Sequence, residues 1–372
     1  MKRCMKCILP ETYPGITFNK KGVCNYCLSY TKMKYGGKRE LINITNLYRN
    51  KNRKYDCIVA LSGGRDSAFA AYYAKKVLNL RVLLCTVNND FMPQQTKENI
   101  LNIKDALDAD IVVEKHDYVR KNVKHILSSW IHKPSPAMIG SLCTGCVTGY
   151  WSGLVKTAKR HQIPLVITGG DELEPSFATK LLSIFNNDKK LPLILGFLME
   201  MIRNPLYILN RNCLIGFTKE YLSRFEYMKY YSSQYMKYYS RYLLYVPIFM
   251  FIEWNEEKIL SVIQNDLNWK RPPHSTTTWR SDCKIHPLKQ YLYKETLGFT
   301  KNDVLLSSMI REDMISRENA LKRLETENII SQQLLIELFD ELGLSFHDLD
   351  IALRRYKKTI GDRKSVGESD FK

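Results

Sequence analysis

The sequence predicts an α/β fold built on a doubly wound parallel sheet. From Asp56 onward, short apolar runs rich in β-branched residues alternate with amphipathic helical stretches, which is the pattern of such sheets. A glycine-bearing turn directly follows the first apolar run, at residues 62–64. Because ligands of these folds bind at the carboxyl ends of the strands, we expect the functional residues along that edge.

The expected elements follow in chain order. Strands are predicted over 57–61 (CIVAL), 81–87 (RVLLCTV), 110–116 (DIVVEKH) and 164–170 (PLVITGG), with helices over 66–77, 94–107, 118–130 and 146–160. After Trp254 the sequence is mostly helical, over 255–264, 311–325 and 331–343. Ser316 has the position and chemistry of a helix N-cap.

These patterns divide the chain into five parts. They are a zinc-binding module with a basic linker (1–45), the α/β domain (46–185), an aromatic-rich helical insertion (186–255), a C-terminal helical region that completes the active site (256–360) and a disordered tail (361–372). The insertion contains a tyrosine-rich segment at 221–245. Its rings either pack within helices or form an acceptor pocket or a partner interface.

Composition excludes some classes of protein. The 372 residues are 45% hydrophobic, enough for a substantial core, but no run approaches the roughly 18 apolar residues of a membrane span. With no apolar stretch of a signal peptide at the start, we expect a cytoplasmic protein. The formal charge of +18 favours anionic partners, but a nucleotide, a nucleotide-sugar, tRNA and an acidic membrane all qualify.

The turn after the first strand is the strongest functional signal. Gly63 and Gly64 permit backbone angles and close approach that side chains forbid, so the turn can form a cup of N–H donors for phosphate. It has no lysine of the Walker type, which argues against a grip on the β,γ-phosphates. The candidate nucleotide-binding residues of this segment are Leu61, Ser62, Gly63, Gly64, Arg65, Asp66 and Ser67, where Ser62, Arg65 and Ser67 offer side-chain donors.

The segment SGGRDS, between an apolar strand and a helix, resembles the PP-loop ATP pyrophosphatases. That resemblance implies cleavage of ATP between the α and β phosphates, with an adenylylated carbonyl as intermediate. It gives Val87 and Asn88 a place at the adenine, and adds Thr168, Gly169, Gly170 and Asp171 at the fourth strand's end. Asp66, or a carboxylate at Asp171, Glu172 or Glu174, could hold Mg²⁺, although a solvated acidic loop is the alternative for 171–174.

Two sets of cysteines stand out among the ten. Cys4, Cys7, Cys24 and Cys27 have the spacing C-x2-C-x16-C-x2-C, which predicts a structural zinc site in a module too small to fold on its own core; a redox or iron site is the alternative. Cys57 and Cys85 lie in predicted strands and are expected to be buried small hydrophobes.

Cys143 and Cys146 form another CxxC pair, immediately before a helix and near the catalytic edge. They could be a redox pair, a metal site or packing residues. With Cys283 from a polar stretch they could hold a 4Fe–4S cluster that leaves one iron open, as in some tRNA thiolases of the superfamily. Asp66, Cys143, Cys146, Cys283 and His286 are the candidates for the chemical step, and a structural histidine is the alternative reading of His286.

From Cys4 to about Arg355 the chain resembles the N-acetyl sugar amidotransferases of bacterial surface-polysaccharide (lipopolysaccharide, O-antigen) synthesis. The resemblance is carried by CMKCILPETYPGITFNKKGVCNYC, ALSGGRDS, CTGC, SDCKIHPLKQYLYKETLGFTKND and IREDMISRENALKRLE. It implies that ATP activates an acetamido oxygen of a sugar or nucleotide-sugar and that ammonia from a separate glutaminase subunit displaces AMP. The competing hypothesis is ATP-dependent sulfur transfer to tRNA or a small molecule, although dispersed basic residues make nucleic acid the weaker partner.

Overall fold

The computed structural model describes residues 1–170, 173, 193–215, 218 and 243–369. Their core is a five-stranded parallel sheet in the order β3-β2-β1-β4-β5. The strands are β1 (Cys57–Ala60), β2 (Val82–Asn88), β3 (Asp110–Lys115), β4 (Leu165–Thr168) and β5 (Leu244–Pro247). The predicted fold class is confirmed.

One of these strands was not predicted from the sequence. β5 lies inside 186–255, which is predicted to be a helical insertion, and it pairs in parallel with β4 through Leu165 and Leu244. The four residues of β5 carry too little local signal to be recognised beside a tyrosine-rich stretch, and the neighbouring edge of β4 supplies the pairing. Helices α8 (Leu193–Arg203) and α9 (Leu206–Leu209) agree with the helical prediction for other parts of this range.

Alternate strand residues face two different helical layers. The β1 residues Cys57 and Val59 belong to the larger apolar core with α3 (Arg65–Tyr72) and α4 (Gln94–Ala106). Ile58 and Ala60 face the opposite side, against Leu154 and Ala158 of α6 (Thr144–His161). This two-residue period places the end of β1, and the turn that follows it, between the layers. Cys57 and Cys85 are fully buried, as expected of small apolar residues.

Two helices differ from their expected bounds in ways that matter for the site. The first begins at Arg65 and continues as a π-helix, η1 (Tyr73–Val77). α6 begins at Thr144, so Cys146 lies inside its first turn, and the preceding 3₁₀-helix η2 (Pro136–Cys143) ends at Cys143. α5 (Tyr118–His132) completes this part of the chain.

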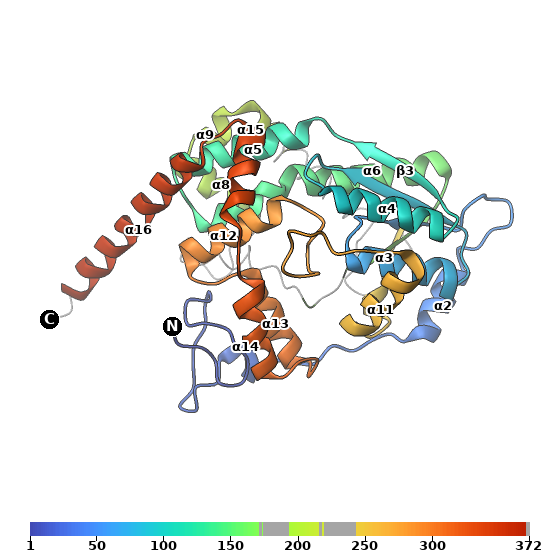
Figure 1. The fold of residues 1–372 in the computed structure, drawn as a ribbon, viewed down its shortest axis with the longest axis horizontal. Helices are drawn as coiled ribbons and strands as arrows, with labels where there is room; N and C mark the ends of the chain where they lie inside the picture. The colour runs from blue at the N-terminus through green and yellow to red at the C-terminus, as the bar shows by residue number, and fades with distance from the viewer. Residues whose placement is uncertain (171–172, 174–192, 216–217, 219–242, 370–372) are drawn as a thin grey trace.

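The C-terminal region is helical, as predicted. After η3 (Ile248–Met250) its helices are α11 (Glu256–Leu267), α12 (Ile285–Leu297), α13 (Lys301–Arg311), α14 (Arg317–Glu327), α15 (Gln332–Leu342) and α16 (Phe346–Ser369). Ser316 caps α14 by accepting from the Asn319 N–H. Residues 361–369, predicted to be a disordered tail, instead continue α16, which extends away from the rest of the chain in Figure 1. No proline interrupts this polar segment, so the helical backbone hydrogen bonds can continue.

The four N-terminal cysteines form the predicted cluster. Cys4 Sγ lies 3.9 Å from Cys27 Sγ and Cys7 Sγ lies 3.8 Å from Cys24 Sγ, with all four ligand atoms within 4.8 Å of one another. The backbone N–H groups of Cys7 and Cys24 donate to Cys4 Sγ at 3.4 and 3.2 Å, and these contacts hold the sulfur in the orientation of a metal ligand. Four buried sulfurs at this spacing fit one tetrahedral metal ion.

The cluster belongs to a small module that docks on the C-terminal helices, beside α13 and α14 in Figure 1. Arg3 Nη1 lies 2.6 Å from the buried Asp303 carboxylate of α13. Arg317 of α14 donates to the carbonyl of Cys7 at 3.3 Å. The module includes α1 (Asn25–Leu28), and α2 (Lys38–Asn46) follows it before β1.

The C-terminal region also reaches the turn after β1. The indole N–H of Trp269, only 2% exposed, donates to the Gly63 carbonyl at 2.9 Å. α11 packs against α3, the helix that the turn begins. Within the described ranges, we find no helix with the length and apolarity that a bilayer crossing requires.

We expect Trp269→Phe to lower the free energy of unfolding by about 1–3 kcal/mol, because the Gly63 carbonyl would be left buried without its donor. Urea denaturation monitored by circular dichroism measures the change. Asn265→Ala, on the exposed face of α11, is the control and should stay within about 0.5 kcal/mol of the wild type. Equal stability of the two variants would contradict a structural role for this bond.

For the cysteine cluster, Cys24→Ser is expected to reduce bound metal from about one ion per chain to near zero, because only three thiolates remain. Thermal unfolding should also shift to lower temperature, since metal binding stabilises the folded module. Cys57→Ala, at a buried cysteine of β1, is the matched control for metal content measured by plasma mass spectrometry. Full metal content in Cys24→Ser would rule out this ligand set.

Candidate functional site

The turn between β1 and α3 is built from serine hydroxyls and glycine backbone. Ser67 Oγ accepts from the Ser62 N–H at 3.1 Å, and Ser62 Oγ accepts from the Gly64 N–H at 3.3 Å. Gly63 has φ +81°, and a Cβ on it would lie 2.8 Å from the Thr96 carbonyl oxygen of α4. Glycine is therefore required both by conformation and by space. Leu61, which precedes the turn, is buried and its N–H is bound to the Cys85 carbonyl.

The end of β4 closes on the same turn. A Cβ on Gly169 would lie 2.2 Å from the Asp66 carbonyl oxygen, so only glycine allows this approach. Thr168 is buried, and its Oγ1 accepts from the Gly170 N–H at 3.4 Å. The structure thus brings the predicted residues 168–170 against the start of α3. Asp171 and Glu172, the predicted magnesium ligands, lie outside the described residues, as does Glu174.

Arg65 does not offer its side chain to phosphate, contrary to the sequence prediction. Its guanidinium is 1% exposed and lies against two indole rings, 4.8 Å from the Trp254 centroid and 5.1 Å from that of Trp279. Arg65 Nη1 lies 2.6 Å from the Glu256 carboxylate. Burial raises the pKa of Glu256, but the charges of Arg65 and Arg323 outweigh this and hold it below its ordinary value. The guanidinium is thus a buried structural cation.

Asp66, the next residue, carries a carboxylate that its neighbours orient. Its Oδ1 accepts from the Trp254 indole at 3.0 Å and from Arg65 Nε at 3.1 Å. The carboxylate remains 22% exposed. It can therefore hold the start of α3 in place and still offer oxygen to a cation outside the turn.

Asp282 is a site residue that the sequence did not reveal. A Cβ on Gly64 would lie 3.0 Å from its Oδ2 and 3.3 Å from Ser62 Oγ, which places this carboxylate at the mouth of the turn. A carboxylate facing a cup of N–H donors favours a cation between it and a bound anion. Its position next to Cys283, already predicted to lie at this edge, is the only signal in the sequence that could have identified it.

The end of β2 contributes a different residue from those predicted. Val87 is buried in the sheet, and Asn88 Oδ1 accepts from the Asp90 N–H at 3.0 Å. Asn89, which was not predicted, is 8% exposed, and its Nδ2 lies 3.5 Å from Cys146 Sγ and 3.9 Å from Cys283 Sγ. The Asn89 amide therefore contacts two of the three cysteines of the predicted cluster.

The third cysteine has a cationic neighbour. Lys289 of α12, which is buried, donates from Nζ to Cys143 Sγ at 3.2 Å. Burial raises the pKa of Cys146 to about 11, and burial, followed by the charges of Cys146 and Cys143, raises the pKa of Cys283 well above its ordinary value. Without metal, Cys146 and Cys283 are thus thiols at neutral pH, and a metal that binds them must displace protons.

These three sulfurs lie further apart than the ligands of one metal ion. Among the described residues, the four N-terminal cysteines are the one group of His, Cys, Asp or Glu side chains whose ligand atoms all lie within 4.8 Å of one another. What the three cysteines share is a position at the edge of the sheet beside Asn89 and Lys289.

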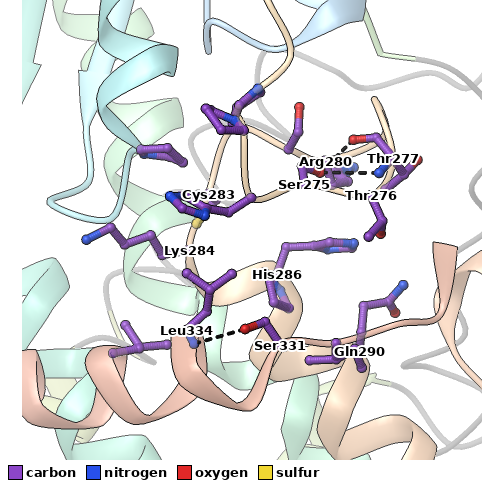
Figure 2. Close-up of a pocket in the computed structure, with 18 of the residues that line it drawn as sticks. Ser275, Thr276, Thr277, Arg280, Cys283, Lys284, His286, Gln290, Ser331 and Leu334 are labelled. Atoms are coloured by element: carbon purple, nitrogen blue, oxygen red, sulfur yellow. Dashed lines mark hydrogen bonds between the residues drawn. The ribbon is translucent and has the colours of Figure 1, made fainter. Parts of the chain in front are cut away.

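His286 follows Cys283 by three residues, and its backbone N–H donates to the Cys283 carbonyl at 3.1 Å. Together with Cys283 it lines a cavity of about 510 Å³. In Figure 2, the His286 side chain lies between the 275–284 loop on one side and Ser331 and Leu334 on the other, and Gln290 lies beside Ser331. The structure thus places His286 in a cavity wall next to the cysteines.

Comparisons with known proteins add little about activity. No family model matches the chain. An uncharacterized protein of Methanocaldococcus jannaschii is 31% identical over 122 residues, which cover 31% of this chain and 43% of that protein. The match thus spans less than half the length of this relative.

Two solved structures resemble the chain weakly. NMN synthetase from Francisella tularensis has a TM-score of 0.38 and 12% identity, over 80% of this chain and 93% of its own. The U34-tRNA thiolase NcsA from Methanococcus maripaludis, with its 4Fe–4S cluster, has a TM-score of 0.37 and 13% identity, over 87% of this chain and 89% of its own. Similarity this low does not assign a function, so the functional argument rests on the residues of this chain.

Proposed function

We propose that this chain is an ATP-dependent enzyme that forms AMP and pyrophosphate while it activates a carbonyl oxygen. The observation that carries the proposal is the turn at residues 62–67, where close backbone approach requires glycine at Gly63 and, from the end of β4, at Gly169. Such a cup of N–H donors at the carboxyl edge of a parallel sheet suits a phosphate group.

The same turn favours cleavage between the α and β phosphates. It has no P-loop lysine to hold the β,γ-phosphates, and its arginine is buried away from the cup. Asp66 and Asp282 supply carboxylate oxygens near the turn, which suits Mg²⁺ bound to a pyrophosphate leaving group. We place the magnesium ligands there in addition to the predicted Asp171 and Glu172.

The acceptor that we propose is the acetamido group of a sugar or nucleotide-sugar, converted to an acetamidino group. An amide oxygen is a poor leaving group until it is joined to AMP; attack by ammonia then expels AMP. The sequence resemblance from Cys4 to about Arg355 supports this choice. Ammonia would come from a separate glutaminase and travel by a shielded path, because free ammonia is largely protonated in water.

Sulfur transfer is the alternative, and one observation favours it specifically. Cys143, Cys146 and Cys283 gather around Asn89 and Lys289 at the edge of the sheet, and they could hold a 4Fe–4S cluster. Such a cluster would supply an open iron for a sulfide. The buried Lys289 cation would balance negative charge on the cysteine ligands, and Asn89 would donate to their sulfurs.

The phosphate assignment is tested with Ser62→Ala. We expect the rate of AMP formation to fall by about 100-fold or more, because a donor that faces the phosphate and also orders the Gly64 N–H is removed. AMP is measured by chromatography with ATP, ammonium and a diacetamido uronic acid nucleotide-sugar. Ser261→Ala, exposed on α11, is the control, and unchanged AMP formation in Ser62→Ala would contradict the assigned phosphate site.

A second experiment separates the two nucleophiles. Protein purified without oxygen is given ATP, a sugar or tRNA acceptor, and either ammonium or sulfide, and the product is weighed by mass spectrometry. We expect the amidino product with ammonium, because an adenylylated acetamide needs only a neutral amine to expel AMP. A thiolated product alone, with pyrophosphate release that depends on tRNA, would overturn this choice. Iron lost in Cys283→Ser but retained in Cys213→Ser would place a cluster at the three cysteines.

A further inference from the structure

Five charged side chains form a network of ion pairs that ends at the turn after β1. In spatial order they are Glu327, Arg323, Glu256, Arg65 and Asp66. Acid and base alternate, and the contacts between successive members are 2.6, 2.7, 2.6 and 3.1 Å long. The members come from α14, α11 and α3, so three helices that are distant in sequence meet in this charge network.

Within the charge network, Arg65 contacts two carboxylates through different nitrogen atoms. Its Nε and Nη2 donate to Asp66 Oδ1 and Oδ2 at 3.1 and 3.3 Å, while its Nη1 donates to Glu256 Oε1 at 2.6 Å. Thr278 strengthens the second contact, because its Oγ1 accepts from Arg65 Nη1 at 2.8 Å and donates to Glu256 Oε1 at 3.0 Å. The guanidinium is therefore held more tightly by Glu256 than by Asp66.

The charge network contains one carboxylate more than it contains guanidiniums. Its three carboxylates and two guanidiniums give a formal charge of −1. Among the carboxylates, Asp66 is the most exposed at 22%, against 17% for Glu256 and 8% for Glu327. Asp66 Oδ2 has acceptor capacity beyond its 3.3 Å contact with Arg65. The excess negative charge is therefore open to a cation at Asp66, beside the turn.

Glu256 determines how strongly Arg65 acts on Asp66. If the side chain at 256 were neutral, the guanidinium would have Asp66 as its one remaining carboxylate partner, and a cation would meet a neutralised pair. Arg323 acts in the opposite direction, because it draws Glu256 away from Arg65 through a 2.7 Å contact. Removing the charge of Glu256 and removing that of Arg323 should thus have effects of opposite sign at Asp66, which a loss of packing would not produce.

We propose that Glu256 is a positioning residue for the metal ion of the nucleotide: it holds Arg65 so that the Asp66 carboxylate can bind Mg²⁺ beside the phosphate turn. Arg323 sets the strength of this effect, because it shares Glu256 with Arg65. The proposal rests on the function proposed above, in which Asp66 supplies oxygen to Mg²⁺. It adds two residues that regulate the affinity of that site for metal without contacting the ion.

The test measures how much Mg²⁺ tightens nucleotide binding. The full chain is titrated with α,β-methylene ATP, which cannot be cleaved between the α and β phosphates, in a calorimeter with Mg²⁺ and again with EDTA. The ratio of the two Kd values is the metal effect. We expect Glu256→Gln to reduce the metal effect by about tenfold without weakening the binding of metal-free nucleotide. Glu257→Gln removes the same charge from the next, exposed residue of α11 and should leave the ratio unchanged.

Two further variants test the route of the effect. Arg323→Gln should increase the metal effect by about threefold, because Glu256 then binds Arg65 alone and Asp66 is less neutralised. Arg323 is 27% exposed, so this variant also decides the question if Glu256→Gln does not fold by circular dichroism. In an Asp66→Asn background, Glu256→Gln should have no further effect on the ratio, since Glu256 acts through Asp66.

The outcomes separate this role from the proposed function. An unchanged metal effect in Glu256→Gln, or binding weakened equally with and without Mg²⁺, overturns the positioning role, as does a smaller metal effect in Arg323→Gln. The expected ratios without AMP formation on any acceptor keep the role and contradict the proposed function. AMP formation by a wild type whose metal effect does not respond to Glu256→Gln overturns the role alone. A wild type that binds no nucleotide contradicts both.

Discussion

The buried guanidinium of Arg65 is the interaction on which the arrangement of the site depends. It lies at the first residue of α3, and apart from the adjacent Asp66 its partners are Glu256, Thr278 and the rings of Trp254 and Trp279, all far along the chain. A buried cation that loses its partners is strongly destabilising, by about 3–5 kcal/mol. The turn after β1 and the C-terminal region therefore form one structural unit, and neither is expected to keep its geometry without the other.

The sequence predicted the parts of the fold that carry a local signal. The first four strands follow from their β-branched apolar runs, and the four-cysteine cluster from the spacing of Cys4 to Cys27. β5 was missed because four residues, Leu244–Pro247, form a strand only through pairing with β4. The continuation of α16 to Ser369 was missed because polar composition describes solvation rather than backbone hydrogen bonding.

In the candidate site, too, the residues with a local sequence signal could be predicted and the others could not. The glycines of the turn could be predicted because their backbone conformation is a local requirement. The structure shows that a side chain at Gly63 would clash with the Thr96 carbonyl and one at Gly169 with the Asp66 carbonyl. Arg65 was predicted to bind phosphate because Glu256 and Thr278, which accept from its guanidinium, are 191 and 213 residues away in the sequence. Nothing next to Arg65 in the sequence points to either of them. Asn89 and Asp282 have no motif of their own, so only the folded chain reveals their contacts with the cysteines and the turn.

The contact between Arg3 and Asp303 has a consequence for how the chain is made. The two residues are 300 positions apart, so the cysteine module leaves the ribosome long before the helices on which it docks. At about 5–20 residues per second, that interval lasts roughly 15–60 s. During it the four cysteines lack the contacts that α13 and α14 later provide, and a metal ion bound to them would stabilise the module over that interval.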